Sequence, residues 1–184
     1  MWLIAGVAAG ALMAGALATG AIAAFWPDLP EMASPPPHFV DEAERAGINH
    51  VYDGDFAYFV GGGVAVLDCD EDGRPDLYLA GGDSPSGLYR NESPIGGSLR
   101  FGQMPDSTAS NLTGVTGAYP LDIDSDQVMD LAVLRVGEDV LLQGRGDCTF
   151  DRANETWGLD ADANDWTVGF SAIWEGDSDL PTLA

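Results

Sequence analysis

The 184-residue sequence predicts an all-β fold, a partial β-propeller of four-stranded antiparallel blades that follows an N-terminal hydrophobic helix. Three observations predict it. An acidic loop flanked by short apolar segments recurs along the chain, a second element that starts at a phenylalanine recurs between the copies, and the apolar segments are too short for helices. Four short strands per unit are typical of propeller blades, and the chain has room for about two and a half of them.

The net charge is strongly negative and excludes several classes of partner. The chain has 30 Asp and Glu residues against 7 basic residues, all of them arginine, for a formal net charge of -23. Such a surface repels nucleic acid and attracts metal cations. Without lysine there is no Walker-type phosphate loop and no Schiff-base chemistry, so the glycine run at 61–63 is not a nucleotide site.

An uncharged apolar segment at the N-terminus predicts export from the cytoplasm. It contains "AIA", a small-x-small site suited to signal-peptidase cleavage, although no Lys or Arg precedes the apolar run. The segment is also long enough to cross a bilayer as a helix, so a cleaved signal peptide and a retained anchor both stay open, and membrane contact is expected only through residues 2–26. The expected organisation is a signal peptide or anchor at 1–26, a proline-rich linker at 27–37 and the incomplete propeller at 38–184.

The acidic loop occurs in three copies. The first is "VLDCDEDGRPDLYLAGG" at 66–82, the second is "PLDIDSDQVMDLAVLRVG" at 120–137, and a shortened third is "WEGDSDLPTLA" at 174–184. The candidate metal ligands in these copies are Asp68, Asp70, Asp72 and Asp76, then Asp122, Asp124, Asp126 and Asp130, and then Glu175, Asp177 and Asp179. Thr182 takes the place of the last acid in the third copy, which weakens the expectation of an ion there.

Other segments between the loops complete each unit. Short strand candidates lie at 87–92 and 139–144, and segments that begin with phenylalanine lie at 39–48, 101–112 and 150–159. Each unit is therefore expected to run strand, acidic loop, strand, turn, strand, turn, strand. The strands beside the loops are nearly continuous apolar runs, which is expected when neighbouring blades cover both faces.

The spacing of the acids explains why they are crowded before a buried strand. Two carboxylates ~5 Å apart repel by about 3 kcal/mol at an effective dielectric of ~20, so an empty cage of four is costly. A divalent cation reverses that sign, and hard oxygen ligands without His or Cys favour Ca²⁺ over zinc, copper or magnesium. Gly73 supplies the positive φ that bends the first loop, whereas Gln127 stands there in the second loop, which should bind more weakly or bend differently.

Two other interpretations of the loop fit its sequence less well. An EF-hand begins with the same acids but should close with a Glu at the twelfth position, where Leu79 and Val133 stand, and a helix rather than a strand should follow. A solvated acidic turn without a ligand is the usual explanation of a single cluster, and the recurrence of the spacing disfavours it here.

The segments "GGGVAVLDCDEDGRPDLYLAGG…GLYRN" and "GDCTFDRANETWGL" resemble the FG-GAP/VCBS repeat proteins, and more narrowly the cartilage acidic protein and ASPIC/UnbV-type family. The resemblance covers roughly residues 38–184. It implies a calcium-binding, integrin-α-like β-propeller, secreted or held at the cell surface, that acts in adhesion or as a scaffold for proteins or glycans. Cys69, Cys148 and Gln127 depart from the family pattern. Because such propellers commonly have more blades, the chain is expected to be a fragment.

The remaining polar residues do not assemble a catalytic centre in the sequence. His38 and His50 are the only histidines, and no nucleophile stands in a triad context. The protein is therefore expected to be a non-enzymatic binding module, with an ancillary propeller of a secreted carbohydrate-active enzyme as the alternative. Cys69 and Cys148 either bridge adjacent blades or pack separately.

Overall fold

The computed structural model describes residues 36–59, 61–159, 165–176 and 180–184. The chain divides into two compact units, Met1–Val40 and Asp41–Ala184. The predicted signal peptide or anchor, its helix and almost all of the linker lie outside the described residues. Among those that are described, no helix has the length and apolar character that a membrane crossing requires. The described part of the first unit, 36–40, has no regular secondary structure.

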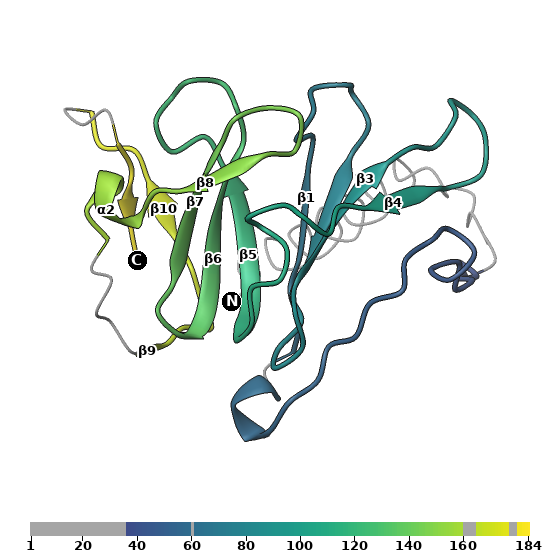
Figure 1. Cartoon of the computed structure of the whole chain (residues 1–184), viewed down its shortest axis with the longest axis horizontal. Coiled ribbons are helices and arrows are strands. Elements are labelled where there is room, and N and C mark those ends of the chain that lie inside the picture. The colour runs from purple at the N-terminus through teal and green to yellow at the C-terminus, as the bar shows by residue number, and fades with distance from the viewer. Residues whose placement is uncertain (1–35, 60, 160–164, 177–179) are drawn as a thin grey trace, which may run out of the picture. The chain divides into compact units, whose positions relative to one another are not determined.

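The second unit is built from two antiparallel sheets whose strands follow one another in sequence order (Figure 1). The first sheet contains β1 (Val64–Leu67), β2 (Asp76–Leu79), β3 (Gly87–Asn91) and β4 (Phe101–Gln103). The second has β5 (Val115–Leu121), β6 (Asp130–Gly137), β7 (Val140–Gly144) and β8 (Phe150–Arg152) as its four-stranded path. The short strand β9 (Asp165–Trp166) pairs with the end of β6 off this path. Up-and-down four-stranded sheets of this kind are propeller blades, so the predicted all-β fold class is confirmed.

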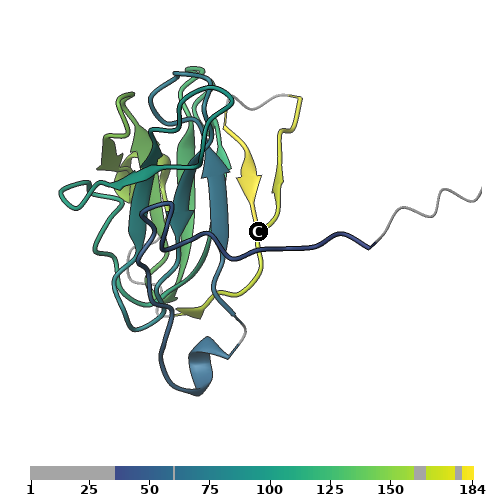
Figure 2. The same ribbon diagram turned by 90° about the vertical axis from the view of Figure 1, so that its right-hand side faces the viewer.

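Shorter elements surround the two sheets. They are the 3-10 helix η1 (Phe56–Tyr58), the helix α2 (Asn154–Trp157), and the strands β9 (Asp165–Trp166), β10 (Ala172–Ile173) and β11 (Thr182–Leu183). β10 and β11 pair with each other beside the second sheet and flank the third acidic segment (Figure 2), as the repeat predicts. The segment 39–48 forms turns and no strand, so the expectation of a strand at its phenylalanine is wrong for this first copy.

The main hydrophobic core lies between the two sheets. Its buried members include Tyr78 and Leu88 from the first sheet, and Leu131, Val133 and Leu142 from the second. Each apolar side chain of this size contributes about 1.5–3 kcal/mol when fully buried. A smaller cluster around Ile123, Ala132 and Leu141 covers the other face of the second sheet. The second sheet is thus apolar on both faces.

The expectation that both faces of the apolar strands are covered is confirmed for β6 and wrong for β1. The first five residues of β6 are buried, whereas Val64 and Val66 of β1 are 59% and 55% exposed. In the alignment of the loops, Val64 corresponds to Ala118, which is buried against the first sheet. The second sheet therefore has a preceding neighbour on this face, and the described residues provide none for the first sheet.

A disulfide between Cys69 and Cys148 joins the two sheets. Cys69 lies in the acidic loop between β1 and β2, and Cys148 lies in the turn between β7 and β8. Their Cα atoms are 4.5 Å apart, and both residues are buried. Of the two arrangements that the sequence left open, the structure shows the bridge between adjacent blades.

We expect reduction of this disulfide to destabilise the pair of sheets. The bridge closes a loop with a sequence separation of 79, for which the chain-entropy model gives a stabilisation of about 4 to 5 kcal/mol. Urea unfolding with and without a dithiol measures the effect. The matched control is the Cys69→Ser, Cys148→Ser double variant, which should have about the stability of the reduced wild type in both buffers. A wild-type transition that the dithiol does not move would contradict this prediction.

Candidate metal centre

The first acidic loop is folded by its own first carboxylate. The Asp68 carboxylate accepts hydrogen bonds from the backbone N–H of Asp72 at 3.1 Å and of Gly73 at 2.9 Å. Glu71 and Gly73 adopt positive φ angles of 58° and 80°. These two left-handed residues reverse the chain between β1 and β2, so that successive acids point toward the same small volume.

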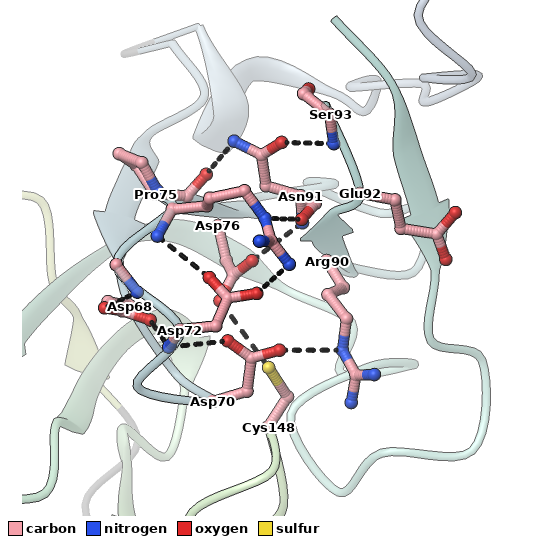
Figure 3. A network of polar contacts seen from close by, with 12 residues as sticks. Asp68, Asp70, Asp72, Pro75, Asp76, Arg90, Asn91, Glu92, Ser93 and Cys148 are labelled. Carbon is pink, nitrogen blue, oxygen red and sulfur yellow. Dashed lines mark hydrogen bonds and ion pairs between the residues drawn. The ribbon is translucent and has the colours of Figure 1, made fainter. Parts of the chain in front are cut away.

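The last carboxylate of the loop is buried and holds three strands together (Figure 3). Asp76 is 0% exposed, and its Oδ2 accepts a hydrogen bond from the backbone N–H of Cys69 at 2.9 Å. Its Oδ1 accepts one from the backbone N–H of Asn91 at 2.7 Å. Asp76 thereby connects the end of β1, the start of β2 and the end of β3. Buried charged acceptors of this kind each form hydrogen bonds worth about 1.5–3 kcal/mol.

The second loop reproduces this geometry. The Asp122 carboxylate accepts from the N–H of Asp126 and of Gln127, both at 3.0 Å. The buried Asp130 accepts from the N–H of Ile123 at 2.7 Å and of Gly144 at 2.8 Å. A β-strand follows each loop, which excludes the EF-hand interpretation.

Gln127 takes the left-handed conformation that Gly73 has in the first loop. Its φ is 74°, and Ser125 has a φ of 61° at the position equivalent to Glu71. A Cβ added to Gly73 would meet nothing within 4 Å, so the position demands glycine for its φ alone and not for space. Of the two consequences expected from Gln127, a different bend is therefore wrong, and the geometry of the bend does not test the expectation of weaker binding.

The structure brings three acids of each loop close enough to share an ion. Potential ligand atoms lie within 4.8 Å of one another in two groups, which are Asp68, Asp70 and Asp76, and Asp122, Asp124 and Asp130. Asp72 and Asp126, which the sequence also proposes as ligands, lie outside these groups. The Asp72 carboxylate instead contacts the Arg74 guanidinium, and Asp126 accepts from the N–H of Val128 at 2.8 Å.

Burial and mutual repulsion perturb the acids that end the loops. Desolvation raises the pKa of Asp76, with smaller contributions from Asp70 and Asp72. In the same way, desolvation and the nearby charges of Asp124 and Asp126 raise the pKa of Asp130 to about 6. In both cases the backbone hydrogen bonds act in the opposite direction. The charged form of these carboxyls thus lacks a compensating positive charge, which a cation would supply.

The donor set fits a divalent cation. Both groups offer carboxylate oxygens only, which are the ligands preferred by hard cations such as Ca²⁺. In the second group the Oδ1 atom of Asp124 is buried and has no hydrogen-bond partner among the described residues. A buried carboxylate oxygen without a partner is costly, so this atom is available for coordination.

Two further sets of residues are less suited to this role. Cys69, Asp76 and Cys148 also lie close together, with the Sγ of Cys69 3.0 Å from Asp76 Oδ2, but the disulfide removes the thiolates that a soft metal would need. In the third loop Glu175 is exposed, and Asp177 and Asp179 lie outside the described residues.

Sequence reasoning missed two residues that contact the acids from the neighbouring strands. Arg90 on β3 lies with its Nε 3.2 Å from Oδ2 of Asp70, and Gln143 on β7 donates from Nε2 to Oδ2 of Asp124 at 2.5 Å. Both immediately precede the residue whose N–H reaches the buried aspartate. This shared position in the third strand of each unit is the sequence signal that could have identified Arg90 and Gln143.

A comparison with known protein families found a repeat model that covers both equivalent loops. Residues 68–133 match the family model of the FG-GAP-like repeat. The match begins at the first acid of the first loop and ends within β6, so the matched region contains both loops. The narrower resemblance to the ASPIC/UnbV-type family stays a prediction. A comparison with curated proteins found no match for this chain.

We expect Gln127→Gly to stabilise the protein, because it removes a left-handed non-glycine residue. The net gain in unfolding free energy should be about 0.5 to 1 kcal/mol, after the greater freedom of glycine in the unfolded chain is subtracted. Urea unfolding in the presence of a chelator measures it. Gln127→Ala is the control, since it removes the side chain but keeps the backbone strain. Equal gains from both variants would contradict the explanation.

Proposed function

We propose that this chain is a calcium-binding β-propeller scaffold that works outside the cytoplasm and binds proteins or glycans without catalysing a reaction. The observation that carries the proposal is the agreement of the two acidic loops. Their sequences differ at the bend and between the acids, yet each gathers three carboxylates within 4.8 Å of one another at the same end of a sheet. The FG-GAP-like repeat over the same residues supports a scaffold.

Calcium is the cation that the ligands favour. All six grouped ligands are aspartates, and Asp76 and Asp130 are buried with both oxygens already accepting backbone hydrogen bonds. Calcium tolerates irregular coordination by such oxygens, whereas magnesium demands near-ideal octahedral geometry and zinc favours nitrogen and sulfur. Millimolar calcium is found outside cells, where weakly binding modules use it.

The role as a scaffold is supported by two polar residues outside the loops, which bond to backbone groups of the fold. Nε2 of His50 lies 2.8 Å from the carbonyl oxygen of Ala80, so this imidazole is part of the packing of the first sheet. Asn154 is buried and bonds the backbone of Asp139 and Leu141. These contacts stabilise the fold, so His50 and Asn154 have structural roles.

A cluster of exposed aromatic rings is the surface best suited to a partner. Phe56 and Phe59 are 73% and 78% exposed and Trp166 is 47% exposed. The Phe56 ring packs edge-on against both others, with centroid distances of 5.9 and 6.1 Å. Exposed aromatic groups of this kind are enriched at binding sites. Trp157, by contrast, packs against the core.

We expect two calcium ions to bind to the described loops and to stabilise the protein. At a free calcium concentration 100 times the dissociation constant, each site should add about 2.7 kcal/mol to the unfolding free energy. Calorimetric titration gives the number of sites, and thermal unfolding with and without a chelator gives the stabilisation. Asp68→Asn and Asp122→Asn should each remove one site.

The control is Glu44→Gln, which removes an exposed charge from a residue outside both loops. It should keep both ions. An unfolding transition that calcium and chelator leave unchanged, together with no heat of binding, would overturn the calcium part of the proposal.

We expect the aromatic cluster to be needed for recognition of a partner. A glycan array probed with the protein in calcium should show binding that is lost in Trp166→Ala, because a flat ring is removed from the cluster. Phe39→Ala removes another exposed ring outside the cluster and serves as the control. Binding that both variants retain would assign recognition to another surface.

A further inference from the structure

The two loops have the same backbone but differ in the charges around them. Their equivalence extends to the third strand, where Asn91 and Gly144 each donate an N–H to the buried aspartate of their loop. The residues before them, Arg90 and Gln143, therefore occupy equivalent positions. One carries a positive charge and the other none, so the two sites offer an approaching cation different environments.

Arginines already compensate the acids of the first loop. Nε of Arg90 is buried and lies 3.2 Å from Oδ2 of Asp70, as an ion pair rather than an aligned hydrogen bond. The side chain of Asp70 is only 9% exposed, so water screens this pair weakly. Arg74 contacts the carboxylate of Asp72 in the same loop. Two of its aspartates thus have a guanidinium partner.

The second loop has neutral residues at the corresponding positions. Gln143 donates to Oδ2 of Asp124 at 2.5 Å and leaves Oδ1 of the same carboxylate buried without a partner among the described residues. Val128 replaces Arg74 in the alignment of the loops. The amide satisfies one oxygen but does not neutralise the charge. The full negative charge of Asp124 is therefore left for a cation.

We propose that Arg90 and Gln143 set the order in which the loops bind a divalent cation, with the second loop binding about tenfold more tightly than the first. A cation entering the first loop meets a positive charge on one of its own ligands and must share or displace it. A cation entering the second loop meets only carboxylates and an amide. This inference rests on the proposed calcium binding and assigns the control of affinity to two residues on the neighbouring strands.

The backbone at the bend does not reverse this order. Gln127 is strained, but the loop has its left-handed φ without requiring an ion, since the hydrogen bonds of Asp122 already hold it. The strain therefore lowers the stability of the fold rather than the affinity for the ion. Glycine at the bend alone would predict the opposite order.

The test measures the calcium affinity of each loop separately within one protein. The N–H groups of Gly73 and Gln127 each donate to the first acid of their loop, so their amide resonances report on one site each. We expect calcium titration of the full-length protein, followed by ¹H–¹⁵N NMR, to shift Gln127 at about tenfold lower free calcium than Gly73.

Reciprocal variants test the assignment. Arg90→Gln should raise the affinity of the first loop about tenfold and leave the second unchanged, and Gln143→Arg should lower that of the second loop by a similar factor. Arg45→Gln removes the same charge from an exposed pair with Glu42 and should change neither loop.

Wild-type loops that titrate together would overturn the inference, as would an Arg45→Gln effect equal to that of Arg90→Gln. If the variants unfold, the wild-type titration still decides the order. Failure of the inference is distinct from failure of calcium binding, in which neither amide would respond to calcium at all.

Discussion

The rest of the structure depends on a buried carboxylate at the end of each acidic loop. Asp76 and Asp130 accept backbone hydrogen bonds from their own loop and from the third strand of the sheet, and so fix three strands at one end. Removing either carboxylate would leave buried N–H groups without acceptors, at about 1–3 kcal/mol each. The sequence between the acids is less restricted, which explains why Cys69 and Ile123 occupy equivalent places.

Repetition of this unit gives each sheet two different faces. Ala118, Leu131 and Val133 of the second sheet pack on the first sheet, while Ala132 and Leu141 pack toward β11. Successive units therefore stack in one direction, and each buries its apolar surface against the next. The disulfide reinforces the contact between the two complete sheets, from a loop on one to a turn on the other.

The features that the sequence predicted are those that depend on local sequence pattern. Strands β1, β2, β5 and β6 were expected beside the acidic loops because apolar runs interrupted by a bend and repeated along the chain have few other solutions. The grouping of Asp68, Asp70 and Asp76 followed from their spacing. The orientation of Asp72 toward Arg74, the contacts of Arg90 and Gln143, and the exposure of Val64 depend on partners distant in sequence or on side-chain rotamers. A single sequence does not specify these.

The same carboxylates serve the fold and the site, so ion binding and stability are linked. A cation held by Asp68, Asp70 and Asp76 would offset the desolvation and the repulsion that raise the pKa of Asp76, and Asp76 is the residue that ties β1, β2 and β3 together. Binding free energy at such a site is stabilisation of the sheet. Because Cys69 donates to Asp76 and is bridged to the second sheet, an ion in the first loop would also act on the contact between sheets. The second loop has Ile123 at that position, so an ion there would act mainly within its own sheet.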